Sequence, residues 1–216
     1  MNNRSLRGLY VIADAQTLGD TGLADKVAAA IKGGAAIVQY RDKRPHQDQM
    51  EANARQLLSL CQEHRVTFIV NDAVELAARI GAHGVHLGKD DLGVKEARAL
   101  LGARTLIGVS CYDEFPRAEL AEKLGADYIA FGRFYPSATK PLAVQAEIEL
   151  LHRARSHIHV PVCAIGGITV DNGGALIQAG ADMLAVVQGV FGESDITLAA
   201  QKFQHLFQHQ GHIGLV

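Results

Sequence analysis

The sequence is poor in cysteine and has no long apolar run. Its three cysteines, Cys61, Cys111 and Cys163, are an odd number and show no CxxC spacing. This argues against a disulfide framework and against a structural zinc site. No apolar stretch is long enough to cross a bilayer and no signal peptide is evident, so we expect a cytoplasmic protein without a membrane partner.

The sequence also has few charged residues. Charged residues make up 20% of the 216 residues, the formal net charge is −2, and 48% of the residues are hydrophobic. This balance gives no general reason to expect a nucleic-acid partner, and the apolar fraction is sufficient for a sizeable core. The histidines are scattered without ligand spacing, and we interpret the residues from about 209 onward as a short polar tail.

Short apolar runs alternate with helical patterns along the whole chain. The runs have the length of buried strands, and the stretches between them carry apolar residues at helical spacing. The predicted strands are residues 9–13, 36–40, 67–70, 84–87, 105–109, 128–131, 162–165 and 183–187. The predicted helices are residues 23–31, 49–61, 74–80, 94–101, 117–124, 147–154, 171–178 and 198–207.

Four helix-to-strand junctions resemble one another, with the sequences GGAAIVQY, GAHGVHLG, GADYIAFG and GADMLAVV. In each, a glycine ends a helix and a short turn leads into a strand. Repeated units of this kind, without a linker rich in Pro, Gly and Ser, predict an α/β fold, a single (β/α)8 TIM barrel over residues 1–216. The alternative is an open doubly wound sheet, but YVIADAQTLGD lacks the GxGxxG fingerprint of that fold.

Polar residues gather where the predicted strands end, which is where a barrel of this kind carries its chemistry. The third strand ends in IVND, and Asn71 and Asp72 have two interpretations there. They either begin a turn and cap the next helix, or they contribute to a site. Further candidates after other strands are Gln39, Arg41, Lys43, Lys89, Asp90, Asp91 and Ser110, with the segments FGRFYPSATKP and IGGI.

These residue types suit a diphosphate held through Mg²⁺. Asp72 and Asp91 are hard oxygen ligands of the kind that Mg²⁺ prefers, and Mg²⁺ usually shares its shell with substrate phosphates. Arg41, Lys43 and Lys140 supply cations for a multiply charged anion. Each residue taken alone could equally form a salt bridge at the rim, but their convergence from several strand ends favours a site.

A second anion site is indicated after the seventh strand. Gly166 and Gly167 allow the backbone to approach a ligand closely, and Asp171 or Asn172 begins the next helix. TIM barrels often bind a monophosphate at this position. One diphosphate and one monophosphate predict two small-molecule substrates.

Six segments at successive strand ends carry a family resemblance: QYRDK, IVND, GVHLGKDD, GVS, FYPSATK and AIGGIT. Through them the chain resembles the thiamine-phosphate synthase family along nearly its whole length. The resemblance implies a Mg²⁺-dependent transferase that joins hydroxymethylpyrimidine diphosphate to a thiazole phosphate, releasing diphosphate and forming thiamine phosphate. It implies that diphosphate leaves first, giving a pyrimidine-methyl cation that the thiazole nitrogen attacks.

The resemblance also assigns site residues. It implies catalytic roles for Lys140, Ser110 and Arg41, and Mg²⁺ ligation by Asp72 and Asp91. The implied contacts of the pyrimidine diphosphate are Gln39, Tyr40, Arg41, Asp42, Lys43, Asn71 and Ser110, with Lys140 on the leaving group. The implied contacts of the thiazole phosphate are Ser137, Ala138, Thr139, Gly166, Val187 and Gln188.

The chain departs from the family pattern in three places. Lys89 and Asp90 stand where Gln and Glu are common, Tyr112 stands where His is common, and Gln188-Gly189 replaces a usual Ser-Ala pair. The metal and diphosphate residues are all present.

Rival functions differ in what they require of these residues. A thiazole tautomerase-like isomerase has no need of the two aspartates, and neither does another phosphate-binding barrel such as an epimerase or a tryptophan-pathway enzyme. A non-catalytic sensor of phosphate ligands would bind both substrates without turnover. Self-association into a homo-oligomer is left open.

Overall fold

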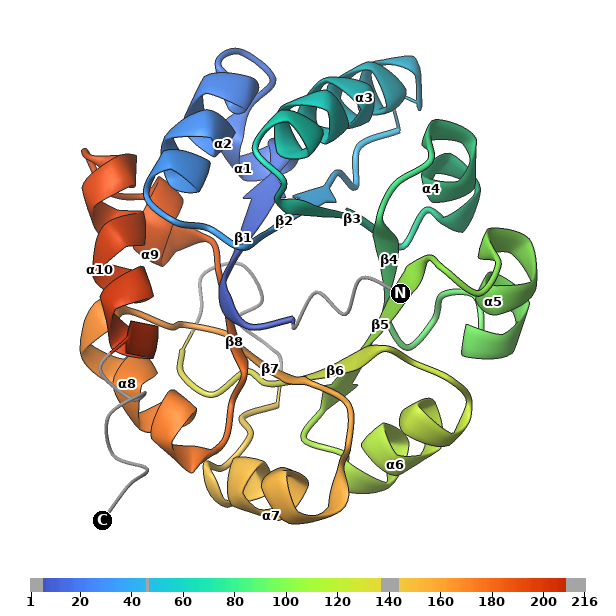
Figure 1. Ribbon diagram of the computed structural model, residues 1–216, viewed down its shortest axis with the longest axis vertical. Helices are drawn as coiled ribbons and strands as arrows, with labels where there is room; N and C mark the ends of the chain where they lie inside the picture. The colour runs from blue at the N-terminus through green and yellow to red at the C-terminus, as the bar shows by residue number, and fades with distance from the viewer. Residues whose placement is uncertain (1–5, 46, 137–143, 209–216) are drawn as a thin grey trace.

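Eight strands follow one another around a closed barrel, in the order β1 to β8. The computed structural model describes residues 6–45, 47–136 and 144–208, and Figure 1 looks into the barrel. The strands are β1 (Gly8–Asp14), β2 (Ile37–Arg41), β3 (Thr67–Asn71), β4 (Gly84–Leu87), β5 (Leu106–Tyr112), β6 (Tyr128–Phe131), β7 (Val162–Ile165) and β8 (Met183–Val186). All neighbours pair in parallel, and β1 pairs with β8 to close the barrel. The predicted TIM barrel is confirmed.

Helices surround the barrel as a ring (Figure 1). They are α2 (Leu23–Lys32), α3 (Gln47–Glu63), α4 (Val74–Ile80), α5 (Val94–Leu101), α6 (Phe115–Lys123), α7 (Glu149–His157), α8 (Val170–Ala179) and α10 (Ile196–Gln208). Two further helices, α1 (Ala15–Leu18) and α9 (Gln188–Phe191), were not predicted, because four residues are too few to show an apolar period. The last helix, α10, packs beside α2 and α8 and so completes the ring.

Side chains alternate along the strands between two apolar cores. Along β1, for example, Leu9, Val11 and Ala13 belong to the core between barrel and helices, while Tyr10 and Ile12 belong to a smaller core inside the barrel. This period of two follows from strand geometry, and burial on both faces explains why the strands read as continuous apolar runs. The three cysteines are buried free thiols.

Among the elements whose boundaries differ from the prediction are helix α6 and strand β5. Helix α6 begins at Phe115 instead of residue 117, because Pro116 fits the first turn, where its missing N–H costs no hydrogen bond. Strand β5 continues past residue 109 to Tyr112, with an irregular register between Ser110 and Tyr112 of the kind a β-bulge produces. Among the described residues, no helix is both long and apolar enough to span a membrane, and the tail from about 209 lies outside them.

Gly108 is expected to be essential for packing inside the barrel. A methyl group there would lie 2.0 Å from Cζ of Tyr128, its partner on β6. Gly108→Ala should therefore destabilise the protein by about 1–3 kcal/mol, the usual cost of overpacking, measured by urea unfolding.

Gly174 provides the matched control for this substitution. It lies within α8, and a methyl group there meets no atom within 4 Å. Gly174→Ala should stabilise the protein by about 0.5–1 kcal/mol through helix propensity. Equal effects of the two alanines would show that the Tyr128 ring is not confined as described.

Candidate active site

A cavity of about 330 Å³ opens at the carboxyl ends of the strands. Side chains inside the barrel, among them Tyr10, Gln39 and Cys163, form its floor, and residues that follow the strands form its mouth. A cavity of this size suits a small-molecule ligand.

Side chains alternate along β2 in a way that divides the QYRDK segment. Gln39 and Arg41 line the cavity, whereas Tyr40 and Asp42 are absent from its described lining. The Tyr40 hydroxyl instead donates to Oδ2 of Asp42 at 3.0 Å, on the side of the strand that faces the helices. The structure thus brings Gln39 and Arg41 to the site and places the Tyr40 and Asp42 side chains behind it.

Arg41 is held in the cavity by a buried carboxylate. Its NH1 group donates to Oδ2 of Asp14 at 2.5 Å, and Asp14 ends β1 with its side chain 2% exposed. Asp14 also accepts from the backbone N of Gln16 at 3.0 Å, which caps α1. The carboxylate both fixes the guanidinium and compensates its charge when no anion is bound.

Three charged side chains meet at the rim next to Asn71. Lys43, Asp72 and Asp91 follow the neighbouring strands β2, β3 and β4. Lys43 donates to Oδ2 of Asp72, and the backbone N of Gly88 donates to Oδ2 of Asp91 at 2.6 Å. Asn71 lines the cavity, while these three charged side chains lie just outside its described lining.

The alternative that Asn71 and Asp72 cap a helix does not hold for their side chains. Helix α4 begins at Val74, its N-cap is Ala73, and no side-chain hydrogen bond caps it. Asp72 has φ 59°, a left-handed conformation that Asp adopts more readily than most residues. The turn therefore directs the Asp72 carboxylate to Lys43 and the rim.

The two rim carboxyls of Asp72 and Asp91 lie close enough to interact. Burial, followed by the neighbouring Asp72 carboxyl, raises the pKa of Asp91 above its usual value. Within the described residues, no group of three or more His, Cys, Asp or Glu side chains could hold a metal ion. The pair of oxygen donors fits an ion that keeps water or substrate oxygens in its shell, as Mg²⁺ does.

A chain of hydrogen bonds crosses the cavity floor from Gln39 to Ser110. Gln39 Nε2 donates to Tyr10 Oη at 2.7 Å, and the hydroxyls of Tyr10 and Tyr128 lie 2.9 Å apart. His86 Nδ1 lies 2.9 Å from Tyr128 Oη, and His86 Nε2 lies 2.9 Å from Ser110 Oγ. Burial raises the pKa of both tyrosines, so both keep their protons, and the linked network fixes the orientation of Gln39 and Ser110.

Glycines shape the opposite side of the mouth. Gly166 and Gly167 line the cavity with φ 101° and 63°. A methyl group at Gly167 would lie 2.3 Å from the Pro136 carbonyl oxygen, so the turn after β7 needs glycine to pack against the segment after β6. The turn leads into α8, where Thr169 and Asn172 form a capping box. Backbone N–H groups at such a helix start favour an anion.

The other residues that the family resemblance assigns to the site fall into two groups. Asn71, Ser110, Val187 and Gln188 line the cavity. Ser137, Ala138, Thr139 and Lys140 lie outside the described residues.

Reasoning from the sequence overlooked Asp14 and the interior residues Tyr10, His86 and Tyr128. Alternation along GVHLG places His86 inside the barrel, between Val85 and Leu87 of the outer core, and could have identified it. Asp14 directly follows the first predicted strand, residues 9–13, and Asp72 lies just beyond the third. Its place at a strand end was an available signal.

Residues 9–190 match the family model described as thiamine monophosphate synthase. Thiamine-phosphate synthase of Thioalkalivibrio sulfidiphilus is 47% identical over 203 residues, covering 94% of this chain and 96% of the relative. Its counterpart in Thiobacillus denitrificans is 50% identical over 182 residues, covering 84% and 86%.

A solved structure agrees with these sequence matches. Thiamine phosphate pyrophosphorylase from Pyrococcus furiosus superimposes with a TM-score of 0.85 at 31% identity, covering 96% of this chain and 98% of that one. The family model spans most of the barrel and the relatives match over nearly their full length. The chain therefore belongs to the thiamine monophosphate synthase family.

Proposed function

We propose that this chain condenses hydroxymethylpyrimidine diphosphate with a thiazole phosphate to give thiamine phosphate and diphosphate. The observation that carries the proposal is the two-sided mouth of the cavity. Arg41 and the Lys43–Asp72–Asp91 rim lie on one side, and the Gly166–Gly167 turn lies on the other. The first side suits a diphosphate with its metal ion, and the second suits a monophosphate.

On the diphosphate side of the mouth, a metal ion and two cationic side chains would bind the diphosphate. Asp72 and Asp91 would hold Mg²⁺, which when bound would neutralise charge on the diphosphate oxygens. Arg41 presents a guanidinium already oriented by Asp14, and such a fork matches phosphate geometry. Lys43 contacts Asp72, so its ammonium lies at the same rim.

The carbon–oxygen bond to diphosphate is proposed to break before the carbon–nitrogen bond to the thiazole forms. Negative charge then accumulates on the departing diphosphate, so Arg41 and Lys140 would act mainly in the transition state. The role of Lys140 rests on the family resemblance. Ile12, Ala130 and Ile165 line the cavity and would limit the access of water to the pyrimidine-methyl cation.

The pyrimidine ring, the thiazole ring and the thiazole phosphate would contact the remaining residues that line the cavity. Gln39, Asn71 and Ser110 would contact the pyrimidine, with Gln39 and Ser110 held by the floor network. The thiazole phosphate would lie against Gly166, Val187 and Gln188. The family resemblance implies that Ser137, Ala138 and Thr139 also contact the thiazole phosphate.

Product analysis tests the proposal directly. The protein is incubated with both substrates and Mg²⁺, and the mixture is separated by chromatography with mass detection. Thiamine phosphate should form only when both substrates are present. Isomerisation of the thiazole substrate without condensation would indicate the tautomerase alternative. Binding of both substrates without any product would indicate a sensor, and either result would overturn the proposal.

The Gln188 side chain is expected to contribute little to thiazole phosphate binding. Gln188 is exposed, and its Oε1 points back into the turn of α9, where a methyl group at Gly192 would lie 2.7 Å from it. Backbone N–H groups are therefore the better candidates for the phosphate contact. Gln188→Ser should leave the thiazole phosphate KM within about threefold, under ~0.7 kcal/mol. A tenfold change in steady-state KM would show that the side chain takes part.

A further inference from the structure

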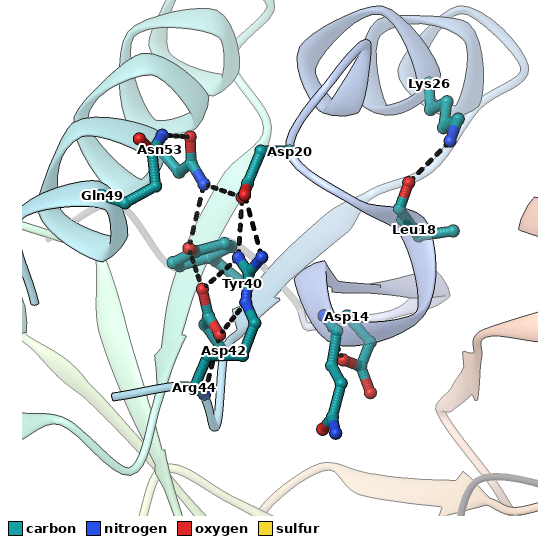
Figure 2. A network of polar contacts seen from close by, with 10 residues as sticks. Asp14, Leu18, Asp20, Lys26, Tyr40, Asp42, Arg44, Gln49 and Asn53 are labelled. Carbon is teal, nitrogen blue, oxygen red and sulfur yellow. Dashed lines mark hydrogen bonds and ion pairs between the residues drawn. The ribbon is translucent and has the colours of Figure 1, made fainter. Parts of the chain in front are cut away.

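A polar network lies behind the end of β2, on the side away from the cavity. Figure 2 shows Tyr40, Asp42 and Arg44 pointing together toward Asp20 and toward Asn53 of α3. Asn53 Nδ2 donates to Asp20 Oδ1 at 2.7 Å and is itself 3.4 Å from the Tyr40 hydroxyl. The network joins the end of β2 to the loop that precedes α2 and to α3.

Arg44 is the centre of this network. Its Nε and NH2 groups donate to Asp42 at 2.8 Å and 2.6 Å, and its NH1 and NH2 groups donate to Asp20 at 2.8 Å and 2.7 Å. Its backbone N donates to Asp42 Oδ1 at 3.0 Å as well. One guanidinium thus binds two carboxylates through both of its edges, an arrangement that fixes its plane (Figure 2).

The network holds the backbone from which Arg41 and Lys43 project. Arg41 faces the cavity and Lys43 faces Asp72, while the alternate residues Tyr40, Asp42 and Arg44 are fixed on the other side. We propose that Arg44, acting with Asp42 and Asp20, is a positioning residue that orients Arg41 and Lys43 toward the diphosphate. This inference rests on the proposed function of the same site.

The buried position of Asp42 explains why Arg44 is needed. The Asp42 side chain is 2% exposed, and burial acts to raise its pKa, yet the hydrogen bonds from Arg44 outweigh burial and lower it. Without Arg44, the Asp42 carboxylate would keep the hydrogen bond from the Tyr40 hydroxyl but lose its cation, which favours a movement toward water. Because Asp42 lies between Arg41 and Lys43 in the chain, such a movement would displace both cations.

Steady-state kinetics of Arg44→Met tests the proposal. We expect the KM for the pyrimidine diphosphate to rise about tenfold, while the KM for the thiazole phosphate changes less than about twofold, since the opposite side of the mouth is unaffected. Asp20→Asn, a milder variant that leaves the Asp42–Arg44 contacts in place, should raise the same KM by about threefold. The double variant should resemble Arg44→Met alone, because Asp20 acts through Arg44.

Arg55 supplies the matched control. Its Nε and NH2 groups donate to a single carboxylate oxygen, Oε1 of Glu51, within α3, and its side chain is 52% exposed. Arg55→Met should leave both KM values unchanged. The positioning role would be overturned if Arg44→Met and Asp20→Asn each raised the KM of both substrates by the same factor. It would also be overturned if the two substitutions had additive effects on KM in the double variant. Failure of the proposed function is distinguishable, because the wild-type protein would then form no thiamine phosphate.

Discussion

Asp72→Asn is expected to lower the rate of thiamine phosphate formation about 10²-fold at limiting Mg²⁺, by analogy with the loss of one electrostatic stabiliser. A neutral amide is a weaker ligand for a hard cation, so the loss should act through metal use. Asn also tolerates the left-handed backbone at this position, where φ is 59°, so the turn itself should persist.

The measurement is a titration of activity with Mg²⁺. The variant should need a much higher Mg²⁺ concentration for half-maximal rate, and excess Mg²⁺ should recover part of the activity. Asp90→Asn is the control, because Asp90 is an exposed neighbour of Asp91 to which the family resemblance assigns no role. If Asp72→Asn turned over normally at low Mg²⁺, the ligand assignment would be wrong.

Arg41→Met should affect stability and catalysis together. Removing the guanidinium leaves the Asp14 carboxylate buried without its cation, which should destabilise the protein by about 3 kcal/mol, the lower end of the range for a broken buried pair. The same change removes a cation from the diphosphate side and should lower kcat/KM by about 10²-fold or more. Urea unfolding and steady-state kinetics measure the two effects.

A double variant separates these two effects. In Asp14→Asn/Arg41→Met no buried carboxylate remains at the end of β1, so most of the lost stability should return. Activity should stay low, because the diphosphate still lacks its guanidinium. Recovery of activity along with stability would mean that Arg41 has only a structural role and does not bind the substrate.

The fold could be predicted because barrel strands carry a strong local signal. Each strand is buried on both faces and reads as an apolar run, and glycines such as Gly81 end the preceding helices. Helix α9 escaped prediction because a four-residue turn has no period to detect. The prediction began α6 at residue 117, directly after Pro116, whereas the helix starts at Phe115, because proline suits a first turn.

The site was predictable by position but not by side-chain direction. Strand ends indicated Arg41, Asn71 and Ser110 as candidates, and all three line the cavity. The family resemblance assigned all five residues of QYRDK to the substrate. Side chains alternate between the two faces of a strand, however, and Tyr40 and Asp42 lie on the face away from the cavity. Contacts across the barrel interior, such as that of Tyr10 on β1 with Tyr128 on β6, depend on the closure of the barrel and leave no local pattern.

A crystal structure with Mg²⁺, thiamine phosphate and diphosphate bound would test the central claim most directly, namely that one cavity mouth holds both anions. Mg²⁺ should lie about 2.0–2.1 Å from oxygens of Asp72 and Asp91 and should share the diphosphate, with Arg41 and Lys43 on the same anion. The monophosphate of the product should contact the Gly166–Gly167 turn across the cavity. A diphosphate found away from Arg41 and Lys43, or a metal ion that touches neither aspartate, would contradict the account.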